Sequence, residues 1–97
     1  MAIRVVGRDL LRAFIVDHAD SAGALQSWLW ELESADWANP GQLKARFPSA
    51  SLLAGNRVVF NIRGNRYRLV AVMAFGARIV RIDWLGTHAE YYDRRRY

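Results

Sequence analysis

The second half of the chain contains three runs in which apolar side chains recur with a period of two. The runs are RVVFNI at 57–62, RYRLVAVMAF at 66–75 and RIVRIDWL at 78–85. Short glycine-containing segments, RGN and GA, separate them, and such segments commonly join antiparallel strands. The sequence therefore predicts a three-stranded antiparallel meander, which constrains the fold more than any other feature.

Two-residue loops would fix the register of these strands. A loop at 64–65 places Asn61 opposite Arg68, and a loop at 76–77 places Arg68 opposite Leu85. Because a slip of one residue exchanges the two faces of a strand, these registers also predict which side chains share a face. The predicted core face holds Val58, Phe60, Ile62, Tyr67, Leu69, Ala71, Met73, Phe75, Val80, Ile82 and Trp84.

The opposite face of the meander is predicted to be mixed. Its polar cluster near the first loop consists of Asn61, Arg63, Arg66 and Arg68, with Leu85 beside Arg68. Its apolar remainder consists of Val59, Val70, Val72, Ala74 and Ile79. Soluble proteins seldom leave such a patch bare, so a C-terminal segment or a partner protein is expected to cover it.

The first half of the chain has helical spacing instead. Apolar residues recur at intervals of three and four, which is typical of amphipathic helices that cover one face of a sheet. Together with the meander, these helices predict a single α+β domain that spans residues 1–97. In chain order we expect a strand at 3–6, helices at 9–18 and 20–37 with Asp20 or Ser21 as N-cap, a turn at 39–41, and a short helix at 42–47 that Pro48 ends.

The charge distribution favours an anionic partner. The chain has a formal charge of +5, and residues 42–97 hold Lys44 and ten arginines against three acidic residues. Arginine binds phosphate through a planar, bidentate fork of N–H donors. A basic surface of this composition indicates nucleic acid as the partner.

Several other classes of protein are excluded or disfavoured. The chain has no cysteine, which excludes disulfides and thiol catalysis, and its two histidines have no metal-ligand spacing. We therefore expect neither a metal nor another cofactor. No apolar run is long enough to span a membrane, and the N-terminus does not resemble a signal peptide, so we expect a soluble, cytoplasmic protein without a membrane partner.

The C-terminal segment GTHAEYYDRRRY could complete a site for RNA. The predicted register carries the chain from the last strand toward His88, at the same end of the sheet as Arg68. A guanidinium, an imidazole and tyrosine rings could serve metal-free cleavage, in which a 2′-hydroxyl attacks the adjacent phosphorus. The same residues also have structural interpretations, since a histidine after a strand is often a cap, tyrosines often pack, and DRRR is often a solvated tail.

The segments LKARFPSA, VFNIRGNRYRLV and IDWLGTHAEYYD resemble the HigB family of toxins in type II toxin–antitoxin systems, within the RelE-like superfamily. The resemblance covers almost the whole chain and implies a RelE-like fold. It also implies an endoribonuclease that cuts mRNA, commonly on the translating ribosome. The expected partner is a HigA-like antitoxin with a helix-turn-helix domain that binds DNA.

The resemblance also implies site residues, because Lys44, Asn61, Asn65, Arg68 and His88 fall on motif positions of the family. We expect Arg68, His88 and Tyr91 to be catalytic. We expect the RNA contacts to come from Lys44, Asn61, Arg63, Asn65, Arg66, Tyr92, Arg94 and Arg95.

Two departures from the family pattern bear on these roles. Ala89 stands where relatives often carry lysine, and a second tyrosine stands in the family's EYD motif. The motif therefore leaves open whether Tyr91 or Tyr92 does the work of the family tyrosine. Two other functions also stay open: a non-catalytic module that binds RNA or the ribosome, and a degenerate toxin that acts only as the partner of an antitoxin.

Overall fold

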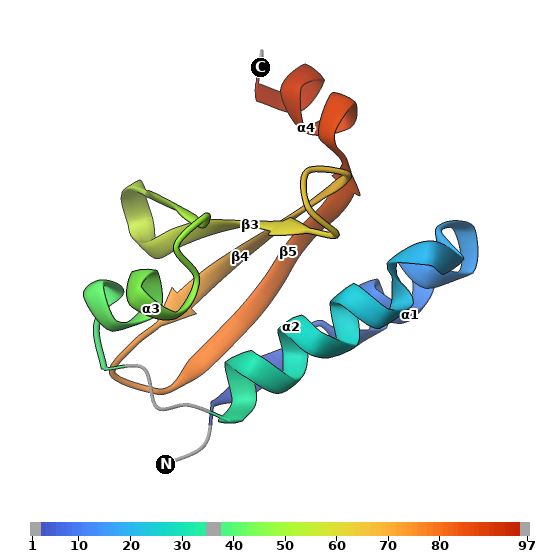
Figure 1. The fold of residues 1–97 in the computed structure, drawn as a ribbon. Coiled ribbons are helices and arrows are strands. Elements are labelled where there is room, and N and C mark those ends of the chain that lie inside the picture. Colours follow the sequence, from blue (N-terminus) through green and yellow to red (C-terminus); the bar gives the residue numbers. More distant parts are fainter. Residues whose placement is uncertain (1–2, 35–37, 96–97) are drawn as a thin grey trace.

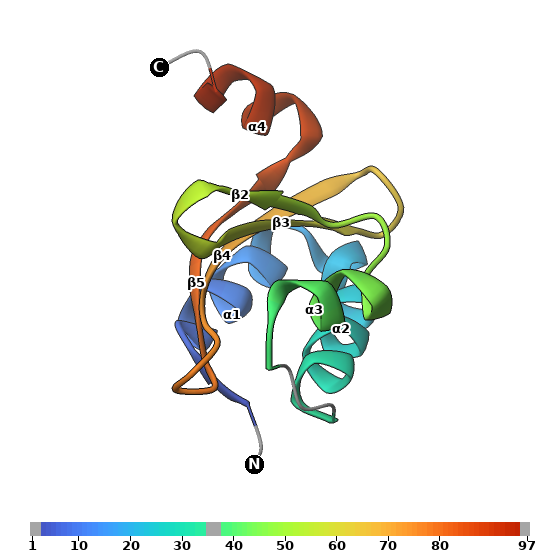
Figure 2. The same cartoon turned by 90° about the vertical axis from the view of Figure 1, so that its left-hand side faces the viewer.

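The computed structural model describes residues 3–34 and 38–95, and its centre is a five-stranded sheet in the order β1-β5-β4-β3-β2. Helices α1 and α2 lie against one face of the sheet, and α4 stands beyond the other face at one end (Figures 1 and 2). The predicted α+β class is therefore confirmed. In chain order the elements are β1 (Arg4–Val6), α1 (Arg8–Asp17), η1 (Ala19–Ser21), α2 (Ala22–Ser34), α3 (Pro40–Arg46), β2 (Ser51–Leu53), η2 (Ala54–Asn56), β3 (Arg57–Ile62), β4 (Tyr67–Ala74), β5 (Ile79–Thr87) and α4 (His88–Arg95).

The predicted meander is confirmed as strands β3, β4 and β5. Both loops contain two residues: the amide of Arg66 donates to the carbonyl of Arg63, and the amide of Arg78 donates to that of Phe75. The first register is also as predicted, with Asn61 opposite Arg68. These turns and the alternating pattern were sufficient to fix the pairing of β3 with β4.

The predicted register between β4 and β5 is wrong beyond Ile82, because a β-bulge interrupts the pairing. Ile82 pairs with Ala71, as a loop at 76–77 requires, but Trp84 pairs with Val70 and Gly86 with Arg68. The extra residue in β5 turns every later side chain to the other face. Trp84 consequently leaves the predicted core face and Leu85 joins the main core.

The sheet also has two strands beside the meander that change its outline. The predicted N-terminal strand is present as β1, and it pairs in parallel with β5. Strand β2 was not predicted, and it pairs antiparallel with the first half of β3. The meander is thus the centre of a larger mixed sheet, because segments distant in sequence supply both edges.

The helices begin at residues that suit their backbone. Gly7 precedes α1 with a φ of 94°, and a Cβ there would approach Ile82 of β5 to 3.0 Å. The predicted turn at 39–41 is instead the start of α3: the side chain of Asn39 accepts from the amide of Gln42, and Pro40 occupies the first turn. The predicted end of the second helix at 35–37 lies outside the described residues.

The main core lies between the sheet and helices α1, α2 and α3. It contains the predicted face of the meander from Val58 to Ile82, to which the helices add Leu11, Leu25, Trp28, Leu32 and Leu43. In the part of the chain that the structure describes, no helix is long and apolar enough to cross a membrane.

A smaller apolar cluster lies on the opposite face of the sheet. Tyr91 of α4 packs there on Val59 and Val70, with Trp84 against them. The C-terminal segment therefore covers this part of the apolar patch, as one of the two sequence-based alternatives expected. Farther from α4 on the same face, Ala74 is exposed.

Candidate functional site

The junction of β5 and α4 positions the candidate site. The amide of Thr87 donates to the carboxylate of Glu90 at 2.8 Å, and the amide of Glu90 donates to the hydroxyl of Thr87 at 3.1 Å. This reciprocal pair is a capping box, which starts a helix directly after the strand. The THAE spacing is its sequence signal, and our sequence analysis overlooked it. The box fixes His88 as the first residue of α4.

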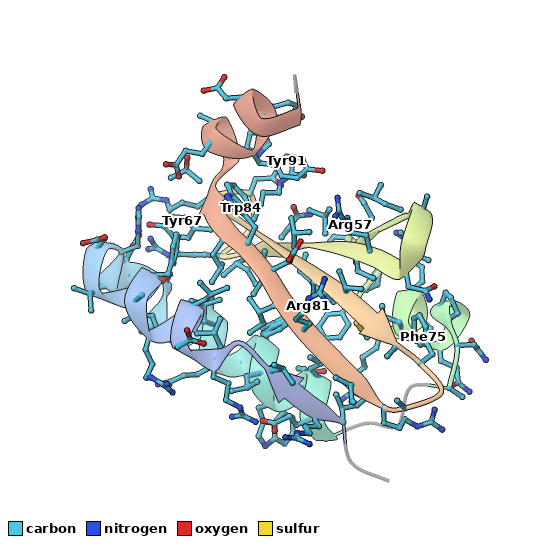
Figure 3. All side chains as sticks on the ribbon, turned by 180° about the vertical axis from the view of Figure 1, so that it is seen from behind. Arg57, Tyr67, Phe75, Arg81, Trp84 and Tyr91 are labelled. Carbon is cyan, nitrogen blue, oxygen red and sulfur yellow. The ribbon has the colours of Figure 1, made fainter. Side chains whose placement is uncertain are left out.

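Gly86 allows the Trp84 ring to lie across the end of β5. A Cβ at Gly86 would stand only 2.4 and 2.5 Å from two ring carbons of Trp84. Gly86 is also the cross-strand partner of Arg68. The bulge and this glycine together place the indole ring of Trp84 beside Arg68. Figure 3 shows Trp84 and Tyr91 close together where β5 passes into α4.

Arg68 is the centre of the site. Its Nη2 donates to Nδ1 of His88 at 3.2 Å, and its Cζ lies 5.2 Å from the centre of the Tyr91 ring, in a cation–π arrangement. Its Nε is buried and has no hydrogen-bond partner among the described residues. The guanidinium is therefore held from two sides and keeps N–H capacity for an anionic ligand.

The two tyrosines of α4 occupy different environments. Tyr91 is buried against the sheet, with its ring 6.1 Å from that of Trp84. Tyr92 is 47% exposed, and its ring lies 4.7 Å from that of His88. Tyr91 thus supports the arginine from within, whereas Tyr92 lies at the surface beside the imidazole.

Asn61, on β3, is the cross-strand partner of Arg68 on β4. Its Nδ2 donates to the carbonyl oxygen of Ser49 at 3.2 Å, while its Oδ1 is buried without a partner among the described residues. Asn65 lies in the hairpin loop, and both asparagines line a hollow together with Ser49 and Gly64. The structure thus places Asn61 directly opposite Arg68, and Asn65 at the same hollow as Asn61.

Arg63 and Arg66 form a separate cluster on the helix side of the hairpin. Both guanidiniums contact Asp20, and the Tyr67 hydroxyl donates to the same carboxylate at 2.5 Å. The left-handed backbone at Arg63, with a φ of 55°, allows its side chain to leave the alternation of the strand. The expectation that Arg63 and Arg66 share the polar cluster of Arg68 is therefore wrong.

Asp20 was one of the two residues expected as N-cap of the second helix, but its carboxylate accepts these contacts instead. The hydrogen bond from Tyr67, followed by contacts with Arg66 and Arg63, holds the pKa of the Asp20 carboxyl below its ordinary value. The same carboxylate raises the pKa of the Tyr67 hydroxyl by accepting its hydrogen bond. Sequence spacing gave no signal for this cluster, because its members lie far apart along the chain.

Three other predicted RNA contacts are Lys44, Arg94 and Arg95, and of these the structure describes only the side chain of Lys44. The ammonium of Lys44 donates to the carbonyl oxygens of Pro48 and Ala50 at 2.7 and 2.5 Å, which holds the connection between α3 and β2. Arg94 and Arg95 belong to the last turn of α4, and their side chains lie outside the described part of the structure.

The site suits acid–base chemistry on an anion. It brings the fixed guanidinium of Arg68 on β4 together with the half-buried imidazole of His88 and the exposed phenol of Tyr92 on α4. In residues 3–34 and 38–95, no group of three or more His, Cys, Asp and Glu side chains could hold a metal ion.

The chain matches the model of a known protein family. The model of the HigB toxin family, described as the RelE-like toxic component of a toxin–antitoxin system, matches residues 21–94. This span contains both the β3–β4 hairpin with Arg68 and the junction with His88. No curated protein matches the chain.

Proposed function

Since this chain belongs to the HigB family of RelE-like toxins from toxin–antitoxin systems, we propose that it is an endoribonuclease that cleaves mRNA without a metal. The observation that carries the proposal is the contact of Arg68 with His88. It joins the two groups that RNA cleavage needs first, a fixed cation for the phosphate and a side chain that transfers protons near neutral pH.

The contact defines the starting tautomer of the histidine. A guanidinium can only donate, so Nδ1 of His88 accepts and the ring proton lies on Nε2. A phosphate that binds Arg68 competes for this N–H group and releases Nδ1. His88 can then accept the proton of the 2′-hydroxyl while the 2′-oxygen attacks phosphorus.

The remainder of the reaction requires charge stabilisation and an acid. As the bond between 2′-oxygen and phosphorus forms, Arg68 stabilises the additional negative charge on the phosphoryl oxygens. The bond from phosphorus to the 5′-oxygen breaks, and an acid supplies the proton that the leaving oxygen takes up. The products are a 2′,3′-cyclic phosphate and a free 5′-hydroxyl.

The two tyrosines divide the remaining roles. The sequence led us to expect a catalytic role for Tyr91, but its burial beneath Arg68 favours a positioning role for its ring. Tyr92 is exposed beside His88, which favours its hydroxyl as the acid. We therefore propose that Tyr92 does the work of the family tyrosine in the EYYD motif.

We assign the outer RNA contacts in two groups. Asn61 and Asn65 contact nucleotides next to the scissile phosphate, since Asn61 is the cross-strand partner of Arg68 and Asn65 shares a hollow with Asn61. More distant phosphates are bound by the other basic residues. These are Arg63 and Arg66, which remain 47% and 61% exposed, together with Lys44, Arg94 and Arg95.

The family also implies an antitoxin as partner. We propose that this partner is a HigA-like protein with a helix-turn-helix domain and that the toxin cleaves mRNA on the translating ribosome in the cytoplasm. The net charge of +5 supports binding to the RNA-rich surface of a ribosome.

The proposal is tested by comparing the wild type with Arg68→Ala and His88→Gln. We expect the wild type to arrest growth and to cut reporter mRNA, in the presence or absence of a chelator. Each variant should cut about 10² to 10³ times more slowly, because a preorganised charge or a proton-transfer group is lost. Mapping the 5′ ends of the fragments measures the cleavage.

Arg57→Ala is the matched control, because it removes one arginine charge from an exposed position on the same sheet. Melting curves should show that all variants fold. Unchanged cleavage by both Arg68→Ala and His88→Gln would eliminate the site assignment. A wild type that binds RNA but leaves every transcript intact would instead support the non-catalytic binding module.

A further inference from the structure

A hollow without charged groups adjoins the Arg68 site. It has a volume of about 370 Å³, and Ser49, Asn61, Gly64 and Asn65 line it. No lining side chain is ionisable, so the hollow offers only hydrogen bonds and van der Waals surface. The volume lies within the range of about 300 to 1,000 Å³ that is usual for small-molecule sites.

The amide of Asn61 has a fixed orientation in this hollow. Nδ2 donates to the carbonyl oxygen of Ser49 at 3.2 Å, and the flipped amide would place two acceptors against each other. Oδ1 is then the atom that is buried without a partner among the described residues. An unpaired buried acceptor is unfavourable, and an arriving N–H donor would satisfy it after a small side-chain shift.

The position of the hollow relative to Arg68 is set by the sheet. Asn61 and Arg68 are direct cross-strand partners, so their Cα atoms are about 5 Å apart. A ligand that fills the hollow therefore lies within about one nucleotide of an anion on Arg68. The space at Gly64 is open, because a Cβ added there would meet no atom within 4 Å.

We propose that this hollow binds the base of a nucleotide next to the scissile phosphate, and that Asn61 selects a base with an exocyclic amino group. Adenine, cytosine and guanine can donate such a group to Oδ1. Uracil offers one ring N–H between two carbonyl oxygens, and these would face the acceptors of Asn61 and Ser49. The selection rests on the proposed function, which supplies the RNA and the phosphate on Arg68.

The test measures the affinity for short 2′-O-methyl RNA oligonucleotides that cannot be cleaved. At each position of the oligonucleotide in turn, the base is adenine, cytosine, guanine or uracil. We expect uracil to weaken binding about tenfold at one position, in line with discrimination by a single base contact. Asn61→Ala should abolish this preference.

Ser49→Met is a second variant that fills the hollow without changing Asn61 or Arg68. It should weaken the binding of all four oligonucleotides that differ at the selected position and make their affinities equal. Ser34→Met, at the end of α2, is the control and should retain the preference. If Asn61→Ala proves unstable in melting curves, Ser49→Met still decides the question.

Two results would overturn the inference: a wild type that binds all four bases equally at every position, or a preference that survives in both hollow variants. Neither result depends on catalysis. If the wild type shows the expected preference but cuts no unmodified RNA, the endoribonuclease proposal fails and the base pocket stands.

Discussion

Arg68 donates a hydrogen bond to Nδ1 of His88, with 3.2 Å between Nη2 and Nδ1. The two residues come from different parts of the fold, since Arg68 lies early in β4 and His88 is the first residue of α4. The hydrogen bond from the His88 amide to the Arg66 carbonyl holds the start of α4 against the start of β4. The proposed reaction depends on this junction.

The geometry of the guanidinium should matter as well as its charge. Arg68→Lys keeps the positive charge but loses the planar fork that contacts His88 and the Tyr91 ring at once. We expect cleavage to fall at least about tenfold, with a smaller loss than in Arg68→Ala. Single-turnover cleavage of a reporter RNA measures this difference, and equal rates for Arg68→Lys and the wild type would contradict it.

The two tyrosines of α4 should respond differently to loss of a hydroxyl. Tyr92→Phe is expected to slow cleavage about 10²-fold or more, because it removes the proposed acid. Tyr91→Phe keeps the ring beneath Arg68 and should have little effect on the rate. Tyr91→Ala should destabilise the fold by about 3 kcal/mol, because it removes a buried ring from the apolar cluster.

Cleavage rates and melting curves for these three variants separate the two roles. The opposite ranking of the two Phe variants would return proton transfer to Tyr91.

Gly86 should tolerate no side chain. Gly86→Ala places a Cβ 2.4 Å from a carbon of the Trp84 ring, so the ring must move away from the end of β5. We expect a loss of about 1 to 3 kcal/mol in the free energy of unfolding, measured with denaturant. Gly23→Ala is the control, since it lies in α2 with no atom within 4 Å of the added carbon, and it should stabilise the helix by up to about 1 kcal/mol.

Asp20 should make stability depend on pH in the acid range. Its folded pKa lies below the ordinary value of 3.8, so its contribution is present above that value. The contribution is lost as the pH falls through the lower folded pKa, because the protonated carboxyl no longer pairs with Tyr67, Arg66 and Arg63. Asp20→Asn should therefore melt at a lower temperature than the wild type at neutral pH, and the difference should shrink below about pH 4.

Melting temperatures between about pH 2 and 7 measure this effect. Asp17→Asn makes the same change in charge on the exposed end of α1 and is the control. A difference between wild type and Asp20→Asn that is constant over the whole range would show that the carboxyl is not coupled to folding.

Local sequence signals determined the centre of this fold. Alternating apolar residues and two short glycine loops were sufficient for the meander and for the pairing of Asn61 with Arg68. The same signals also predicted the end of the sheet at which the chain leaves the last strand, so that Arg68 and His88 could be expected together. These signals are reliable because a hairpin fixes its register through residues that are close in sequence.

Only the tertiary structure decided the faces of the last strand and the partners of several arginines. Trp84 and Leu85 are both apolar, so the period-two pattern fits either face, and the bulge places Trp84 beside the site and Leu85 in the core. The sequence also could not show that Asp20 binds Arg63 and Arg66. Contacts of this kind form between residues that are far apart in the chain. The three-dimensional arrangement of the fold selects the partner there, because local sequence preferences do not reach that far.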